Sequence, residues 1–258
     1  MYVDLHTHLM PGVDDGSPDM KTSLEAIAKL GQAGVSQIAV TPHVNSFFDH
    51  LAPAELYAVV EEMGWGRGGA DPLAFIPQGF AELSQAAEGL GVVLHQGGEL
   101  SPEVACQLSA RQLSCIALGP QGNQFILMEV SLYEPFDESW SEAADHLRLH
   151  GYDILLAHPE RAPNMHSSQA QQLLVEEIGK GVKLQVNLSS LSSARVGSLA
   201  CSLIERELAW CVASDFHPPS RPGDLSTLPE RLSISGLNPE LALLLGCERP
   251  AALLSFGF

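Results

Sequence analysis

The chain has 258 residues, of which 45% are hydrophobic, enough for one medium-sized domain with a substantial core. Its 31 acidic residues against 13 lysines and arginines give a formal net charge of −18. This charge argues against nucleic acid or anionic membranes as the main partner, because binding to phosphate-rich surfaces needs basic patches. No apolar run approaches the roughly 20 residues that span a bilayer, and the cysteines form no CxxC pair. We therefore expect one domain over residues 1–258, in the cytoplasm, with reduced thiols and no membrane insertion.

The first predicted elements alternate between strand and helix. An apolar strand over 2–8 precedes a helix that starts at Ser17-Pro18 and ends near Gly34, and a second strand over 36–40 ends at Pro42. A helix is predicted over 53–63, a loop rich in glycine and proline over 64–79, and a helix over 78–89.

The alternation continues to the end of the chain. Strands are predicted over 92–94, 125–131, 152–157, 183–188 and 209–213, with helices over 138–150, 169–179 and 196–207, and the leucine-rich remainder predicts one or two closing helices. Alternation over the whole length indicates a parallel α/β sheet, and about seven strands is near the number that closes a (β/α) barrel.

Six of the predicted strands carry residues of the kinds that bind metal ions, at or just beyond their C-terminal ends. The C-terminal rim of a parallel barrel is where active sites are built, so we expect these side chains to meet. Together with a carboxylate from the acidic pair that follows the first strand, they are His6, His8, Asp15, His43, Glu99, Glu129, His158, Asp215 and His217.

This set combines imidazoles and carboxylates and contains no thiolate. Mixed nitrogen and oxygen ligands suit manganese, iron or zinc and differ from those of a cysteine-rich structural zinc site. The set is too large for one ion, so two or three divalent metal ions are expected. Clustered metals lower the pKa of a bridging water and hold phosphoryl oxygens, so the set predicts hydrolysis of phosphate esters. Arg161 and Arg221 lie beside motif histidines, and guanidinium groups bind phosphate through two hydrogen bonds at once.

Two other activities do not fit the residue spacing. Gly64, Gly66 and Gly69 match GxGxxG, but a predicted helix precedes them, whereas a dinucleotide site needs a strand before and a helix after. A cysteine-based tyrosine phosphatase needs arginine six residues after its cysteine. The residues at that spacing are Gln112, Gln121, Glu207, His217 and Leu253.

The motifs, in their order along the chain, resemble those of the PHP (polymerase and histidinol phosphatase) superfamily. They are Asp-Leu-His6-Thr-His8, Val-Asp14-Asp15-Gly16, Thr-Pro-His43, Gly-Gly-Glu99-Leu, Met-Glu129-Val-Ser, Ala-His158-Pro-Glu-Arg161 and Ala-Ser-Asp215-Phe-His217. Within that superfamily the sequence most resembles the metal-dependent protein-tyrosine phosphatases of bacterial capsule and exopolysaccharide loci, the CpsB/CapC type.

The resemblance implies a distorted (β/α)7 barrel of the PHP type with a trinuclear centre, often of manganese. By motif, it places one ion on His6, His8, Glu99 and Asp215, a second on Glu99, Glu129 and His158, and a third on Asp15, His43 and His217. It further implies that a metal-bound hydroxide attacks phosphorus while Arg161 and Arg221 bind the phosphoryl oxygens. The implied substrate is a phosphotyrosine protein, such as the tail of a bacterial tyrosine autokinase.

The sequence departs from the family pattern where a substrate would bind. Val44-Asn45 follow His43 where the family often has a further basic residue, the 64–79 stretch is long, and Arg221-Pro-Gly replaces Arg-Pro-Pro. These departures keep open a small-molecule phosphoesterase of the same superfamily, acting on a sugar phosphate or a compound like histidinol phosphate. A non-catalytic metal-stabilised scaffold is the third alternative, although a retired site would be expected to lose ligands.

Overall fold

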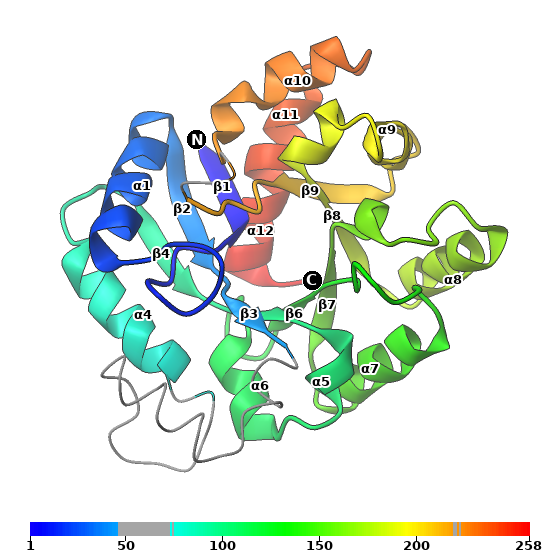
Figure 1. Ribbon diagram of the computed structural model, residues 1–258, viewed down its shortest axis with the longest axis horizontal. Helices are drawn as coiled ribbons and strands as arrows, with labels where there is room; N and C mark the ends of the chain where they lie inside the picture. The colour runs from blue at the N-terminus through cyan, green and yellow to red at the C-terminus, as the bar shows by residue number, and fades with distance from the viewer. Residues whose placement is uncertain (46–72, 74, 219–220, 222) are drawn as a thin grey trace.

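A computed structural model of the chain describes residues 1–45, 73, 75–218, 221 and 223–258. Parallel strands lie at the centre and helices surround them (Figure 1). The strands are β1 (Tyr2–Thr7), β2 (Val35–Val40), β3 (His43–Val44), β4 (Val93–Gln96), β5 (Glu99–Leu100), β6 (Phe125–Met128), β7 (Asp153–Ala157), β8 (Lys183–Asn187) and β9 (Ala209–Ala213).

The helices follow the strands in alternation through most of the chain. They are α1 (Met20–Gln32), α4 (Phe75–Ala86), α5 (Pro102–Ala105), α6 (Ala110–Ile116), α7 (Glu138–Leu149), α8 (Ser168–Gly179), α9 (Gly197–Glu205), α10 (Leu228–Ile234), α11 (Leu241–Leu243) and α12 (Arg249–Phe256). None of the helices in the described part of the chain has the length and apolar character needed to cross a membrane.

The strands pair in the order β1-β2-β4 and β3-β5-β6-β7-β8-β9, all in parallel. β2 and β3 are two parts of one path, because the chain resumes its strand course after Pro42. β4 and β5 are likewise separated only by Gly97-Gly98. Backbone hydrogen bonds from Gly97 to Val40 (3.1 Å) and from Glu99 to Pro42 (2.9 Å) carry the pairing across both interruptions. The described residues thus form seven strand paths in chain order.

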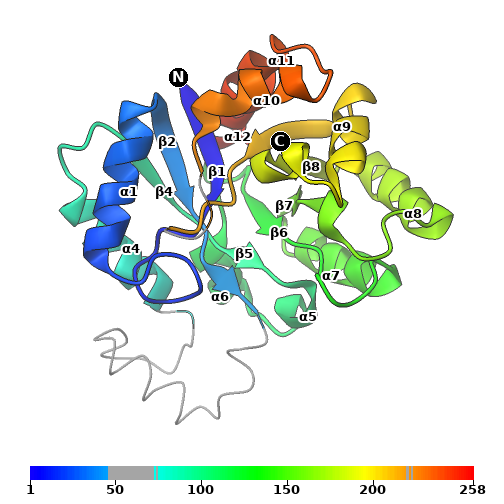
Figure 2. The same cartoon turned by 45° about the horizontal axis from the view of Figure 1, so that its top comes forward.

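The ring of strands is joined between β9 and β1 by isolated contacts and not by a full ladder. The amide of Asp215 donates to the His6 carbonyl (3.0 Å), and the amide of His8 donates to the Phe216 carbonyl (2.9 Å). A parallel bridge links Thr7 to Phe216. This incomplete seam gives the α/β fold the distorted barrel form expected from the sequence, and it brings the segments after β1 and β9 side by side (Figure 2).

Alternation along the strands separates two layers of core. In β7, Ile154 and Leu156 pack in the large cluster beneath the helices, whereas Leu155 and Ala157 belong to a smaller cluster inside the ring, as period-2 side-chain geometry requires. Leu253 of α12 joins the inner cluster. Helix α12 therefore fills the inside of the ring from the end opposite the C-terminal ends of the strands.

Most predicted elements are confirmed within a few residues, with four corrections. Helix α1 begins after an Asp19 N-cap, whose side chain accepts from the Thr22 amide, and not at Ser17-Pro18. The reason is that Ser17 pairs with the loop after β1, since its amide donates to the His8 carbonyl at 2.9 Å. The predicted loop over 64–79 is wrong at its end, because α4 begins at Phe75.

The other two corrections concern numbers of helices. Helices α5 and α6 were not predicted, and α10, α11 and α12 replace the one or two closing helices expected. The helix predicted over 53–63 and most of the 64–79 loop lie outside the described residues.

Candidate metal centre

All nine side chains of the predicted ligand set lie together at the C-terminal ends of the strands. Most are buried, with exposures of 3% or less for His6, His8, Glu99, His158, Asp215 and His217. His43 and Glu129 are partly buried, and Asp15 is exposed on the loop after β1. Imidazoles and carboxylates from six strand paths and one loop therefore share a single site.

Two of these residues have a backbone conformation that non-glycine residues rarely adopt. His158 has φ 36° and Asp215 has φ 53°, both in the left-handed region. Such residues cost of order 1–3 kcal/mol each and persist where the surroundings determine the conformation. Each sits one or two residues beyond its strand, where the turn sends its side chain into the cluster.

Glu99 is the centre of the cluster. Its Oε1 lies 2.8 Å from His158 Nε2. Its Oε2 lies 3.2 Å from His6 Nε2, 3.2 Å from His8 Nε2 and 3.0 Å from His43 Nδ1. One carboxylate thus faces four imidazoles. Two come from β1 and the residue after it, one from β3 and one from the residue after β7.

The donor atoms fall into four overlapping groups, within each of which they lie no more than 4.8 Å apart. Two ligands on opposite sides of one ion are separated by about 4 Å at ordinary bond lengths, so this spacing suits shared ions. The groups are His8, Asp15, His43 and His217; His6, His8 and Asp215; His6, Glu99 and His158; and His43, Glu99 and Glu129.

These groups differ in detail from the grouping that the motifs imply. Asp15, His43 and His217 come together as expected, with His8 added. Glu129 lies with His43 and Glu99, its Oε1 4.0 Å from His43 Nδ1, and not with His158.

The chemistry of the donors fits divalent cations. Glu99 Oε2 and His43 Nδ1 are buried and in contact, yet within the described residues neither has a partner in hydrogen-bond geometry. Burial would raise the pKa of Glu99, but the neighbouring His6 and His43 hold it well below its ordinary value, so its carboxylate is charged. Burial and the Glu99 charge raise the pKa of Glu129 to about 8. Buried carboxylates and imidazoles at this density, some of them lacking a hydrogen-bond partner, are what metal ions compensate.

Asp14, next to Asp15, supports the cluster from behind. Its Oδ2 accepts from His8 Nδ1 at 2.7 Å and from the His43 amide at 3.1 Å. A carboxylate only accepts, so His8 Nδ1 carries the proton of this bond, and Nε2 faces the cluster as the nitrogen available to a metal ion. Gly16 permits this approach, because a Cβ there would lie 2.2 Å from the His8 carbonyl oxygen.

Two supporting residues that were not predicted lie on β8, the strand path that supplies no ligand. Gln185 Oε1 lies 3.0 Å from His6 Nδ1, and Gln185 Nε2 donates to Asn187 Oδ1 at 2.7 Å. Asn187 Nδ2 in turn donates to Asp215 Oδ2 at 2.7 Å. These buried amides orient His6 and Asp215. Gln185 and Asn187 alternate with the apolar Leu184 and Val186, and this alternation was the feature of the sequence that could have revealed them.

Both predicted arginines bind the same carboxylate oxygen. Arg161 Nη1 donates to Asp215 Oδ2 at 2.8 Å, and Arg221 Nη1 also donates to it. Arg221 is held in place by a tight backbone pairing with His217. Each guanidinium has five N–H donors, so binding Asp215 through Nη1 leaves others for a substrate anion at the rim.

Comparison with known proteins gives a consistent result. The family model described as "Capsular polysaccharide synthesis, CpsB/CapC" matches residues 2–65 and 75–227. The tyrosine-protein phosphatase YwqE of Bacillus subtilis is 29% identical over 83% of this chain and 77% of its own. CapC of Staphylococcus aureus is 25% identical over 83% of this chain and 76% of its own.

A solved structure agrees in fold over nearly the whole length. It comes from the crystal structures of YwqE from Bacillus subtilis and CpsB from Streptococcus pneumoniae, which are described as metal-dependent tyrosine phosphatases. The TM-score is 0.69 at 26% identity, and the match covers 99% of this chain and 96% of the other. With its family model matched from β1 to the segment beyond the last ligand, this chain belongs to the CpsB/CapC family of capsular polysaccharide synthesis proteins.

Proposed function

We propose that this protein is a metal-dependent phosphotyrosine-protein phosphatase in which the 258-residue chain acts as one catalytic unit. The observation that carries the proposal is the joint presence of nine clustered ligand-type side chains and two arginines at the edge of the same cluster. The similarity to proteins named as metal-dependent tyrosine phosphatases supports the reaction class.

The proposed metal ligands are the nine residues of the cluster, with manganese as the expected metal and two or three ions in all. Nitrogen and oxygen donors without thiolate suit manganese, iron or zinc, and the family resemblance gives the preference for manganese. When bound, such ions activate water and offset the negative charge on phosphoryl oxygens. Asp14 and Gln185 would hold His8 and His6 in the tautomers that leave both Nε2 lone pairs available.

Arg161 and Arg221 are the proposed phosphate-binding residues. Their shared contact with Asp215 fixes the position of both guanidinium groups before substrate arrives. A phosphoryl group beside Asp215 would meet N–H donors from two sides, and charge-assisted bonds of this kind are about twice as strong as neutral ones. Prior fixation lowers the entropy lost on binding.

The proposed physiological substrate is the phosphorylated tyrosine segment of a bacterial tyrosine autokinase that controls export of capsule or exopolysaccharide. The family description, capsular polysaccharide synthesis, supports this setting. Such a segment lies in the cytoplasm, where we place this enzyme.

The test is release of phosphate from a phosphotyrosine peptide by protein that has been stripped with chelator and then reloaded with Mn²⁺. We expect release only after reloading. Glu99→Gln, which keeps the shape of the central ligand but removes its charge, should abolish release, whereas Arg206→Gln, on the exposed end of α9, should not.

Two results would contradict the proposal. Absence of metal-dependent release would exclude phosphatase activity on phosphotyrosine peptides. A kcat/KM far higher for a small phosphate monoester than for the peptide would favour a small-molecule phosphoesterase instead.

A further inference from the structure

A cavity of about 320 Å³ lies next to the candidate metal centre, among the segments that follow β7, β8 and β9. Arg161 and Arg221 form one part of its wall, so it opens beside the proposed phosphate-binding groups. The rest of the wall comes from the segment after β8 and includes a third arginine, Arg195, with Ser189, Ser190 and Ser193. We call it the arginine–serine cavity.

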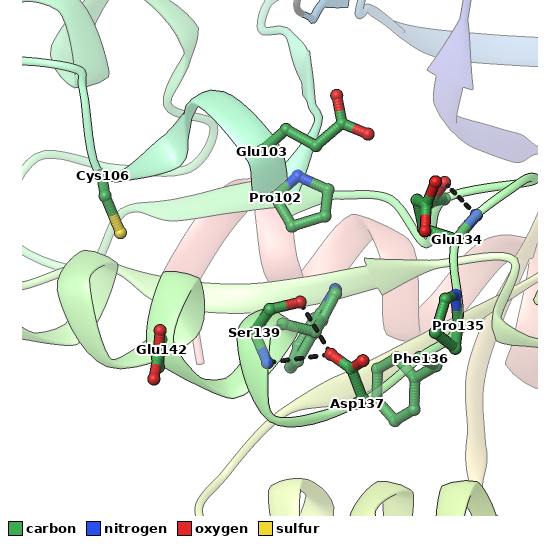
Figure 3. A pocket seen from close by; sticks show the side chains of 11 residues that line it. Pro102, Glu103, Cys106, Glu134, Pro135, Phe136, Asp137, Ser139 and Glu142 are labelled. Carbon is green, nitrogen blue, oxygen red and sulfur yellow. Dashed lines mark hydrogen bonds between the residues drawn. The ribbon is translucent and has the colours of Figure 1, made fainter.

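The charge of this cavity is opposite to that of the protein. Only 13 of the 258 residues are lysine or arginine, yet three of them line it, and none of its described lining residues is a carboxylate. A second cavity, of about 360 Å³, lies between α5 and α7 and has the reverse character (Figure 3). Among the described residues, its lining contains Glu103, Glu134, Asp137 and Glu142 and neither lysine nor arginine. An anion would therefore enter the first cavity and avoid the second.

Arg195 is available for a ligand. Arg161 and Arg221 already bind Asp215, but the Arg195 guanidinium is exposed and has no ion pair within the described residues. The loop that carries it is held in place, because Ser193 Oγ accepts from the amides of Arg195 and Val196 at 3.3 and 3.4 Å. An unpaired guanidinium on an anchored loop, facing a cavity with serine hydroxyls, is suited to a carboxylate or a phosphoryl group.

We propose that the arginine–serine cavity binds a second anionic group of the substrate, next to the phosphotyrosine whose phosphoryl group is hydrolysed. This proposal rests on the proposed phosphatase function and deepens it by defining the class of peptide preferred. The second group is a side-chain carboxylate or another phosphoryl group, and Arg195 is the residue that selects it.

The net charge of the protein makes the proposal sharply testable. A charge of −18 repels additional negative charge on a peptide, so without a local cationic site an acidic neighbour would weaken binding. A preference for an acidic neighbour would therefore arise from the arginine–serine cavity, because the net charge of the whole protein acts against it.

The experiment compares phosphotyrosine peptides with Glu, Gln or phosphoserine placed one or two residues to either side. For the Mn²⁺-loaded protein we expect kcat/KM to be roughly fivefold higher for Glu than for Gln at the best position, as a partly exposed ion pair provides. Phosphoserine should exceed Glu if the natural group is a phosphoryl. In Arg195→Gln the ratio should fall to about one or below, and in Arg195→Lys it should be intermediate.

Arg206→Gln is the matched control, because it removes the same charge from the other end of α9 and should leave the ratio unchanged. The same ratio is read independently of turnover from the Kd of non-hydrolysable phosphonate peptides. A ratio at or below one at every position in the unmodified protein, or a ratio that survives Arg195→Gln, would overturn the proposal. Loss of all hydrolysis with retained selectivity in Kd would instead overturn only the phosphatase function.

Discussion

Asp14 and His8 form a 2.7 Å hydrogen bond between Oδ2 and Nδ1, on the side of the imidazole that faces away from the cluster. Burial would lower the pKa of His8, but Asp14 and Glu99 raise it to about 9. Its neighbour Asp15 points the other way, with Oδ1 3.2 Å from His217 Nε2 and 3.5 Å from His43 Nε2. The two neighbouring carboxylates thus have different roles. Asp14 orients His8, and Asp15 belongs to one of the four groups of candidate metal ligands.

The first prediction separates these roles. Asp14→Asn should lower activity about tenfold, because asparagine still offers an oxygen to His8 Nδ1 and outer partners of metal ligands are worth about 10- to 100-fold. Asp15→Asn should cost more, because it removes a charged donor from its group. Activity and bound metal per chain measure both. A larger loss for Asp14→Asn would show that Asp14 and not Asp15 is the ligand.

The second prediction concerns Gly16, which packs against the same histidine. An added Cβ would lie 2.2 Å from the His8 carbonyl oxygen and 2.4 Å from its Cβ, so the backbone must move. We expect Gly16→Ala to lower the free energy of unfolding by about 1–3 kcal/mol and to reduce metal content. The control is Gly179→Ala, where no atom lies within 4 Å of the added Cβ. Equal stability of the two variants would contradict this account.

Much of the fold was predictable because helix and strand periodicities are local. Helix α6 was not predicted, although Ser109 and Gln112 form a capping box that the sequence displays. The sequence predicts that a strand ends at Pro42. Only the pairing of β3 with β5 shows that the chain resumes its course, and that pairing is a long-range property.

The candidate site divides in the same way. The identities of the ligand-type residues follow from strand ends, but their grouping depends on which carboxylate oxygen meets which ring nitrogen. Glu129 lies beside His43 because of the packing of β3 against β5 and β6, which no local pattern encodes. Neutral amides such as Gln185, and Arg195 on its loop, acquire a role only from neighbours distant in sequence.

A third prediction tests Gln185, whose Oε1 lies 3.0 Å from His6 Nδ1. Gln185→Met fills the same space without an acceptor, so His6 loses the partner that fixes its tautomer. We expect metal affinity to fall by about 10- to 100-fold. Gln185→Glu keeps an acceptor and should retain more affinity than Gln185→Met. The measurement is competition with a chelator of known affinity, and equal affinities for the two variants would argue against an orienting role.

The fourth prediction concerns the two arginines that bind Asp215. Arg161→Ala or Arg221→Ala should lower kcat/KM for a phosphotyrosine peptide by about 100-fold, because a charge-assisted bond to phosphate contributes about 1.5–3 kcal/mol. Lysine at either position should restore only part of the loss, since it cannot form the bidentate contact that a guanidinium makes with phosphate. Steady-state kinetics at saturating Mn²⁺ measure the loss, and metal content must be checked in parallel. Unchanged kcat/KM would remove the arginines from the phosphate-binding site.

The last prediction is the pH dependence of metal binding. Burial would lower the pKa of His43, but Glu99 and Asp15 raise it to about 12, and burial with Glu99 raises that of Glu129 to about 8. In the metal-free protein both groups therefore hold protons at pH 7, as does His8, whose pKa is about 9. Metal ligands must be deprotonated, so binding at this pH releases protons and metal affinity should increase as pH rises from 6 to 8.

Calorimetry in buffers of different ionisation enthalpy counts the protons released. Burial and the neighbouring His8 lower the pKa of His217 to about 4, so His217 contributes none in this range. Glu129→Gln should release fewer protons than the unmodified protein and show a shallower pH dependence, because one titrating ligand is gone. Each proton released corresponds to up to about a tenfold change in affinity per pH unit. An affinity that stays constant between pH 6 and 8 would mean that the ligands are already deprotonated before the metal arrives.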